Sequence, residues 1–383
     1  MSFRRRSLLG LAGLFLTGCV SEAPRFASVE PAPTVEPPPP VVVAPPKPEQ
    51  PERPKPAGFN WAGFSGTWVP FERWCRSNGL PPLQRNSSTP AGFVLSSRRG
   101  ALQLSVGSQS AHWNGIELRL GFAPQMIDSQ FFVHQLDVRK TVEPLLSERQ
   151  GLNASNRSLV IDPGHGGTDS GTHSALDGAL EKEFTLDWAL RLGAALSARG
   201  WRVAFTRTND VNVPLADRVE FAAQRHASLF VSLHFNSAGG DSNQSGLETY
   251  CLTPTGMPSS INRGFGDELS AVFPNNASDP TNLSLACEIH ESILKVGGMQ
   301  DRGVRRARFM SVLRNQARPA ILVEGGYLSN SREAALIATP EYRQKLAEAV
   351  AAGLEQFSKG SQLSANSPSG SGPGGEPGSL AAH

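Results

Sequence analysis

Two histidines and two glutamates stand where predicted strands end or a predicted helix begins. His165 and His234 each follow a short apolar run, Glu324 ends another, and Glu181 opens a long amphipathic segment. Open α/β sheets place their sites at the carboxyl ends of strands, so His165, His234 and Glu324 are expected at one edge of a sheet. Glu181 would reach the same edge from the first turn of its helix.

These residue types fit a catalytic zinc site. Histidine is the commonest metal ligand, and two imidazoles with one carboxylate leave a fourth position for water. Bound zinc would lower the pKa of that water and polarise an amide carbonyl. Glu324 would take the proton of the water and pass it to the leaving amine, and the glycines beside His165 would let backbone approach a ligand closely.

Each of the four residues also has an ordinary structural interpretation. A histidine after a strand is usually a turn residue, Glu181 would favour the helix dipole as a solvated carboxylate, and Glu324 would fit a buried ion pair. The Gly-His-Gly-Gly sequence at 164–167 lacks the lysine and the spacing of a phosphate-binding loop. One shared site explains all four positions together, so we favour it.

Apolar periodicity predicts strands that alternate with helices from about residue 158 to residue 357. The expected strands are 159–161, 201–206, 228–233, 246–252 and 320–324, and the expected helices are 184–196, 215–226, 283–296 and 341–357. Strands separated by helices of this length indicate an α/β fold, with a mostly parallel open sheet and helices on both faces. The preceding segment, with short strands around an Asn114-Gly115 turn, indicates a small α+β domain.

The motifs of the α/β segment resemble, in order, those of the zinc-dependent N-acetylmuramoyl-L-alanine amidase catalytic domain. They are Asp-Pro-Gly-His-Gly-Gly at 162–167, Glu-Lys at 181–182, Ser-Leu-His-Phe-Asn at 232–236, Arg-Gly-Val at 302–304 and Leu-Val-Glu-Gly-Gly-Tyr-Leu-Ser-Asn at 322–330. The resemblance covers residues 160–357, about half of the chain. It departs from the family pattern at Phe235, where alanine is common, and at Gly325, where a larger apolar residue is common.

The resemblance implies that His165, Glu181 and His234 bind Zn²⁺ and that Glu324 is the catalytic carboxylate. The implied reaction is hydrolysis of the amide bond between N-acetylmuramic acid and L-alanine in peptidoglycan. The alternatives are a zinc peptidase or deacetylase that acts on another cell-wall amide, and a catalytically inactive wall-binding tether. The sequence leaves open whether a protein activator takes part.

Five other polar residues near the motifs have weaker claims to the site. His173 and Glu183 are alternative candidates for metal ligands. Glu183 would take the place of Glu181 if the match to the family motif is out of register by two residues. Asn236 is expected to orient His234 or to bind substrate. Arg308 and Arg314 are expected either to meet carboxylates of the substrate or to cover a surface.

The first residues form a predicted targeting signal. Arg4, Arg5 and Arg6 precede an apolar stretch at 7–16 that is too short to span a bilayer, and Leu-Thr-Gly-Cys follows and ends at Cys19. This ending resembles a bacterial lipobox, which implies acyl chains on Cys19 and a periplasmic protein. The same resemblance favours the outer membrane, because Val20 follows the cysteine at the position where an aspartate would imply retention in the inner membrane. The alternative is an ordinary cleaved signal with a chance cysteine, and both Sec and twin-arginine export stay open.

Composition divides the chain into five predicted parts. They are a signal peptide (1–19), a proline-rich disordered linker (20–57), the small α+β domain (58–150), the zinc amidase domain (151–358) and a disordered tail (359–383). The small domain resembles the N-terminal domain of copper amine oxidases in patches, and no chemistry carries over from that family. His112, His134 and, in the later domain, His290 are expected to lie on the surface or in packed positions.

The net charge bears on the class of partner, and the cysteine content bears on whether the protein forms a disulfide. The formal net charge of +2 gives no strong basic field, which argues against nucleic acid as a partner. Three cysteines remain besides Cys19, namely Cys75, Cys251 and Cys287. Because pairing is allowed outside the cytoplasm, Cys251 and Cys287 are the first pair expected to form a disulfide.

The segment 253–280 is expected to be a mobile loop that covers the zinc cleft. It follows a predicted strand and contains four prolines, which argues against long regular structure. The apolar residues between 265 and 273 have helical spacing, so a short amphipathic helix that inhibits the site is the alternative. Glycines at 264 and 266 weaken the start of such a helix and Pro274 stops it, which favours the open loop.

Overall fold

The computed structural model describes residues 58–86, 91–149, 152, 154–239, 242–261, 266–296 and 298–360. These residues belong to one compact unit that begins at Gly58. The predicted signal peptide with Cys19, the linker and the tail after residue 360 lie outside the described residues, so the statements about them stay predictions. Within the described ranges, no helix is both long enough and apolar enough to cross a membrane.

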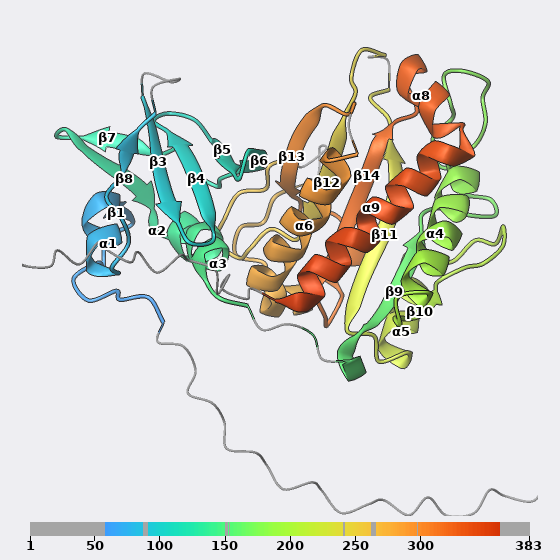
Figure 1. Cartoon of the computed structure of the whole chain (residues 1–383), viewed down its shortest axis with the longest axis horizontal. Helices are drawn as coiled ribbons and strands as arrows, with labels where there is room; N and C mark the ends of the chain where they lie inside the picture. The colour runs from blue at the N-terminus through green and yellow to red at the C-terminus, as the bar shows by residue number, and fades with distance from the viewer. Residues whose placement is uncertain are drawn as a thin grey trace, which may run out of the picture. The chain divides into compact units, whose positions relative to one another are not determined.

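Six neighbouring strands of one sheet form the framework of the later domain (Figure 1). Its strands are β9 (Ser158–Pro163), β10 (Arg202–Phe205), β11 (Leu229–Asn236), β12 (Leu247–Cys251), β13 (Asp301–Arg306) and β14 (Ala320–Tyr327). They lie in the order β10-β9-β11-β14-β12-β13, and β12 pairs antiparallel with β14 whereas the other neighbours pair parallel. The predicted α/β class is confirmed, and the reversal at β12 makes the sheet a mixed one.

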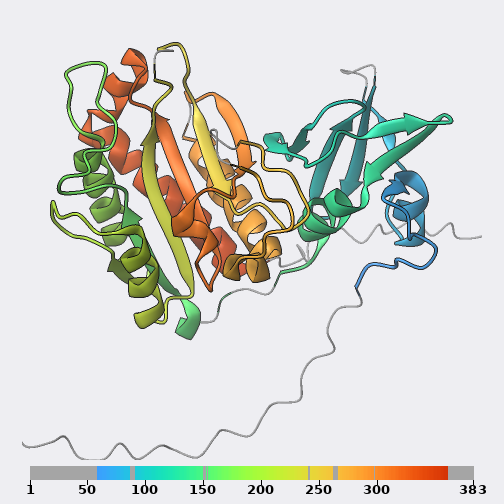
Figure 2. The ribbon, with the colours of Figure 1, turned by 180° about the vertical axis from the view of Figure 1, so that it is seen from behind.

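Helices cover both faces of this sheet because its strands are apolar on both sides. The helices are α4 (Glu181–Ser197), α5 (Leu215–Gln224), α6 (Asp279–Leu294), α7 (Ser311–Arg314), α8 (Ser331–Ile337) and α9 (Pro340–Lys359), with short 3₁₀ turns η2 (Ala154–Asn156) and η3 (Pro274–Ser278). On β9, Leu159 and Ile161 join the core that also holds Trp188 of α4, whereas Val160 joins the core that holds Ala222 of α5. Figure 1 shows α4, α6 and α9 on one face, and Figure 2 shows the opposite face.

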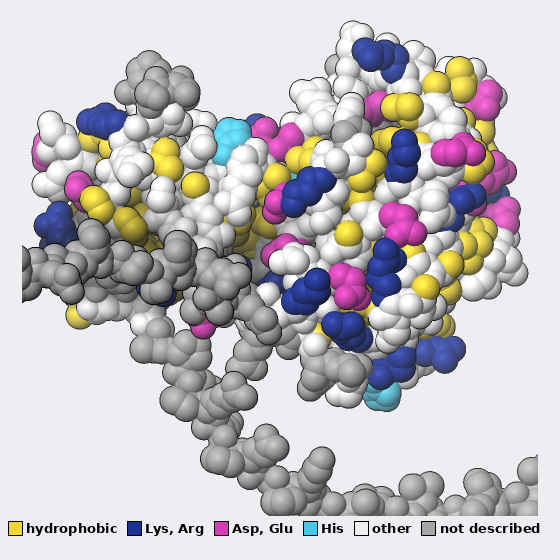
Figure 3. Space-filling model, viewed as in Figure 1, with side chains coloured by type: hydrophobic (Ala, Val, Ile, Leu, Met, Phe, Trp, Pro, Cys, Tyr) yellow, Lys and Arg dark blue, Asp and Glu magenta, His cyan; other side chains and the backbone are white. Residues whose placement is uncertain are grey.

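Charged side chains of both signs are interspersed on the face drawn in Figure 3. On helices α4 and α9, Arg191 pairs with Asp187 at 2.8 Å, and Arg343 reaches the same carboxylate from α9. Arg199 pairs with Glu348 at 2.7 Å just beyond the end of α4. Ion pairs of this partly exposed kind contribute little to stability, so the buried apolar faces hold these helices in place.

The earlier, small domain consists of short strands and helical turns. They are β1 (Trp68–Pro70), α1 (Phe71–Ser77), β2 (Gln84–Arg85), β3 (Gly92–Ser97), β4 (Gly100–Ser105), β5 (Ser110–Trp113), β6 (Ile116–Arg119), β7 (Gln125–Ile127), β8 (Gln130–His134), α2 (Gln135–Asp137), the π-helical turn η1 (Val138–Val142) and α3 (Glu143–Leu146). The predicted hairpin joins β5 to β6, with φ of 51° at Asn114 and 89° at Gly115, as a tight hairpin turn requires. His134 stacks on Phe122 at 3.6 Å between ring centroids, which confirms a packed histidine.

The two domains share one sheet, which the sequence did not predict. Strand β6 pairs parallel with β13 through Leu118 and Val304, so that eleven strands follow one another from β10 to β2. The buried guanidinium of Arg306 donates to the Thr141 hydroxyl at 2.9 Å and to the Lys140 carbonyl at 2.7 Å. A buried charge needs such partners, so the small domain completes the environment of a residue in the later domain.

Two predictions about covalent and local structure were wrong. Cys251 and Cys287 are free, buried thiols, as is Cys75. The Cys251 thiol is directed to the carbonyl of Arg305 at 3.7 Å, and burial raises its pKa to about 11, which keeps it protonated. Helix α6 begins at Asp279 rather than at 283, because Pro280 occupies the first helical turn, where its fixed φ is favourable.

The segment 253–280 forms turns and irregular chain up to η3, over the residues that the structure describes. Residues 266–273 are not helical, Val272 is 74% exposed and Leu269 is 43% exposed, so the amphipathic helix of the alternative prediction is absent from this part. Residues 262–265, which include the first apolar position of that pattern, lie outside the described residues. The segment is therefore an irregular loop at 253–261 and 266–273.

Candidate active site

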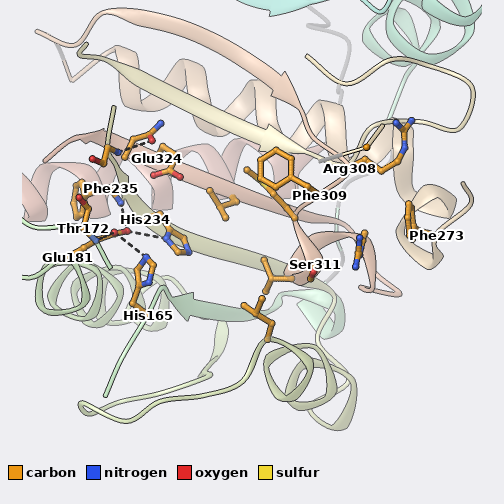
Figure 4. Close-up of a pocket in the computed structure, with 18 of the residues that line it drawn as sticks. His165, Thr172, Glu181, His234, Phe235, Phe273, Arg308, Phe309, Ser311 and Glu324 are labelled. Carbon is orange, nitrogen blue, oxygen red and sulfur yellow. Dashed lines mark hydrogen bonds and ion pairs between the residues drawn. The ribbon is translucent and has the colours of Figure 1, made fainter. Parts of the chain in front are cut away.

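His165, Glu181 and His234 lie together at one edge of the sheet (Figure 4). The Nε2 atom of His165 lies 3.1 Å from one Glu181 carboxylate oxygen, and Nδ1 of His234 lies 3.1 Å from the other. One ligand atom from each of the three residues falls within 4.8 Å of the others. The structure thus brings the three predicted ligands into one cluster.

The parallel strands explain why residues so distant in sequence meet. The β9 strand ends at Pro163 beside Leu233 of β11, so His165 emerges next to His234. Glu181 is the first residue of α4, where a carboxylate interacts favourably with the helix dipole. Its oxygens also accept hydrogen bonds from the backbone amides of Thr172 and Phe235 at 2.9 and 3.0 Å.

Two buried arginines hold the backbone that carries His165. Arg207 donates to the Gly164 carbonyl at 2.7 Å, and Arg218 donates to the His165 carbonyl at 2.8 Å. Arg218 also pairs with the buried carboxylate of Asp162 at 2.7 Å. This support matters because His165 has a φ of 62°, a left-handed backbone conformation that residues other than glycine rarely adopt. Sequence reasoning missed both arginines.

Asp169 is a further residue that sequence reasoning missed. Its carboxylate lies 2.9 Å from Nδ1 of His165, so a proton on Nδ1 leaves the Nε2 lone pair directed to the cluster. Burial alone would lower the pKa of His165, but the hydrogen bonds and charges of Glu181 and Asp169 raise it to about 9. Burial opposes ionisation of Glu181 as well, yet its bonds to His165 and His234 hold its pKa well below the usual range. The signal for Asp169 was its position four residues after His165.

The donor set fits a zinc ion. The His165 and His234 nitrogens lie 3.1 Å from different oxygens of Glu181, and one ligand atom of each residue lies within 4.8 Å of the others, so that one ion between them could contact all three. Two imidazoles and one carboxylate are the donors of a catalytic site that keeps one position for water. His173 and Glu183 are both exposed and lie outside this cluster, so the alternative ligands have no support in the geometry.

Glycines beside the cluster leave room for its rings. A Cβ atom at Gly164 would overlap the His234 ring, and one at Gly171 would lie 2.6 Å from the Glu181 carboxylate. Gly171 also has a φ of 65°, whereas the φ of Gly164 lies outside the left-handed range. Gly164 is therefore required for space and not for its backbone conformation.

Replacing Gly164 with alanine is expected to reduce activity at least about 10-fold and to weaken metal binding, with a stability cost of about 1–3 kcal/mol from overpacking. The new methyl group would push the His234 ring away from Glu181. Metal titration and turnover, measured with Gly58→Ala as the control at an open position, check this expectation. Unchanged metal affinity and turnover in Gly164→Ala would contradict it.

Glu324 lies on β14 directly beside His234 of β11 in the strand register, and only 7% of it is exposed. On the other side its register partner is Glu248 of β12. Arg302 pairs with Glu248 at 3.2 Å, so the charge of that neighbouring carboxylate is balanced. Glu324 thus lines the same cleft as the three candidate ligands without being part of their cluster.

The remaining candidates separate into structural and cleft-lining residues. Asn236 donates to Glu248 at 2.8 Å, which ties it to the carboxylate beside Glu324. His290 is fully buried between Thr249 and Asp301, as expected of a packed histidine. Asn236, Arg308 and Arg314 all line the cleft that holds the candidate ligands.

Comparison with known proteins assigns the later domain to a family. A family profile described as N-acetylmuramoyl-L-alanine amidase matches residues 159–356. Among similar proteins, N-acetylmuramoyl-L-alanine amidase CwlM of Bacillus licheniformis is 33% identical over 51% of this chain and 66% of its own length. N-acetylmuramoyl-L-alanine amidase AmiA of Escherichia coli (strain K12) is 30% identical over 54% of this chain and 77% of its own.

Solved structures of similar sequence also cover about half of the chain. Amidase AmiC2 of Nostoc punctiforme is 33% identical, with a TM-score of 0.44 over 54% of this chain and 98% of the other. The catalytic domain of the amidase CwlV from Bacillus (Paenibacillus) polymyxa is 30% identical, with a TM-score of 0.43 over 52% of this chain and 97% of the other. Because the family profile spans more than half of the 383 residues, the chain belongs to the N-acetylmuramoyl-L-alanine amidase family and is a hydrolase of that class.

Proposed function

We propose that this protein is a zinc-dependent amidase that hydrolyses the bond between N-acetylmuramic acid and L-alanine in peptidoglycan. The observation that carries the proposal is the cluster of His165, Glu181 and His234, with Glu324 in the same cleft. Held by these three ligands, zinc would polarise the amide carbonyl and make a bound water acidic.

The side chains of the chain itself supply the remaining chemistry. Glu324 accepts a proton from the attacking water and delivers it to the leaving nitrogen of L-alanine. Its burial between β11 and β12 keeps bulk water from competing for that proton. Asp169 fixes the proton of His165 on Nδ1, and the amides of Thr172 and Phe235 hold the Glu181 carboxylate in position.

Separation of the products formed from purified muropeptides tests the proposed reaction. The expected products are a peptide that begins with free L-alanine and a glycan that keeps its N-acetyl groups. A zinc peptidase would instead cut within the peptide, a deacetylase would release acetate, and an inactive tether would leave the muropeptides unchanged.

We also propose that acyl chains on Cys19 anchor the protein to the periplasmic side of a membrane, with the outer membrane favoured. Each buried CH₂ of such chains contributes roughly 0.8 kcal/mol, so several chains hold a protein stably. The proline-rich stretch that follows would let the catalytic domain reach the wall.

Replacing Cys19 with alanine is expected to move the protein from the membrane fraction to the soluble periplasmic fraction, because the site of acylation is lost. Fractionation followed by immunoblotting measures this. Val20→Asp is the matched control, which should stay lipidated but shift toward the inner membrane. An unchanged membrane fraction for Cys19→Ala would mean that another feature anchors the protein.

A further inference from the structure

The cleft extends well beyond the three candidate metal ligands. It has a volume of about 750 Å³, and Figure 4 shows His165 and Glu181 at one end and Phe273 at the other, with Phe309 between them. The apolar part of its lining includes Leu215, Phe309, Met310 and Val312. A cavity of this size and composition accommodates several residues of a peptide next to the scissile bond.

Two arginines line this cleft, and their surroundings differ. Arg308 is 4% exposed, pairs with Asp267 and donates to the carbonyls of Pro254 and Met257. Its guanidinium is thus occupied in holding the loop that follows β12. Arg308 therefore fits neither of the two alternatives left open by the sequence, because it is buried and holds the loop instead of meeting substrate or covering a surface.

Arg314 is placed differently. It ends α7, is partly exposed, and its guanidinium lies 5.3 Å from the centroid of the Phe273 ring. Across the described ranges, which omit 262–265, no carboxylate forms an ion pair with it. An arginine stacked on an aromatic ring is oriented yet keeps its donors available, and its planar fork matches a carboxylate.

An acidic side chain lines the cleft as well as the two arginines. Glu268 also lines the cavity, and its carboxylate accepts hydrogen bonds from the amide and hydroxyl of Ser270. The cleft is therefore not uniformly basic, and a ligand carboxylate is favoured only where it meets Arg314.

We propose that Arg314, stacked on Phe273, binds a carboxylate of the peptide that follows L-alanine in the substrate. This inference rests on the proposed amidase function and adds a determinant of substrate class to it. Because Phe273 lies at the end of the cleft opposite the candidate ligands, the carboxylate that reaches Arg314 is the C-terminal one of the peptide rather than one beside the scissile bond. Arg314 selects the free acid, because an amide offers no charge to the guanidinium.

The test compares two disaccharide tripeptides that differ only in whether the C-terminal carboxyl group of the peptide is free or amidated. Arg314→Ala is expected to raise KM for the free acid about 10-fold with kcat little changed, and to leave the kinetics of the amide nearly unaltered. Arg225→Ala is the matched control, since its guanidinium lies 4.9 Å from the Phe221 ring on the exposed end of α5, outside the cleft. Equal effects of Arg314→Ala on both substrates, or none, would overturn the proposal.

A binding measurement separates this inference from the proposed function. Calorimetry with the Glu324→Gln protein, with and without Arg314→Ala, gives the affinity for each tripeptide without turnover. Weaker binding of the free acid alone supports the Arg314 site even if no preparation hydrolyses either substrate, an outcome that would count against the amidase function only. Equal binding of acid and amide by the Glu324→Gln protein would contradict the inference, whatever the activity.

Discussion

Glu324→Gln is expected to lower turnover by on the order of 10²-fold or more while the protein keeps its zinc. Glutamine has nearly the same shape as glutamate but cannot accept the proton of an attacking water. Glu324 lies beside His234 in the sheet but outside the cluster of candidate ligands, so its loss should not empty the metal site. Steady-state hydrolysis of soluble peptidoglycan fragments and elemental analysis of the same sample measure the two quantities.

Glu183→Gln is the matched control for this variant. Glu183 lies in the first turn of α4 like Glu181, but it is exposed and outside the cluster. The Glu183→Gln protein should retain both zinc and turnover. If Glu324→Gln loses zinc together with activity, Glu324 is a ligand and the assigned roles are wrong. If it retains full turnover, proton transfer does not depend on it.

His165→Ala and His234→Ala are each expected to reduce bound zinc from about one ion per chain to a small fraction of that, and to abolish hydrolysis. Each change removes one of the three candidate ligands, whose ligand atoms lie within 4.8 Å of one another. It also leaves the buried Glu181 carboxylate without one of its two imidazole partners. Mass spectrometry of the native protein and elemental analysis after gel filtration give the zinc content.

His173→Ala is the control for the histidine variants. His173 lies in the same loop region as His165 and contacts Ser170 at 3.4 Å, but it is exposed and not part of the cluster. The His173→Ala protein should bind as much zinc as the unmodified protein. Circular dichroism distinguishes loss of a ligand from loss of the fold. Full zinc content in both His165→Ala and His234→Ala would show that the metal, if bound, is held elsewhere.

The sequence predicted those features that depend on short stretches of chain. Apolar periodicity located the strands, and polar residues after β9 and within β11 and β14 indicated the site, because parallel strands bring their carboxyl ends to one edge. The Asn114-Gly115 turn was predictable because few residues adopt the required φ values. Local chemistry was sufficient for each of these.

Features that depend on tertiary pairing were not predictable in the same way. The antiparallel β12 and the joining of β6 to β13 depend on which strand edges meet, and periodicity carries no information about that. Arg207 and Arg218 looked like ordinary charged residues, although the fold buries them against the backbone around His165. The predicted disulfide between Cys251 and Cys287 is not formed, for a related reason. The number of cysteines in a sequence does not specify how their thiols are oriented in the fold.

Digestion of intact peptidoglycan by the zinc-loaded protein, with identification of each new chain end, shows which bond the protein cuts. We expect new amino termini on L-alanine only, with glycan strands that keep their length and their N-acetyl groups. The Glu324→Gln protein should give almost none of these ends under the same conditions. New amino termini on any other residue, free amines on the sugars, or an equal yield from Glu324→Gln would contradict the account.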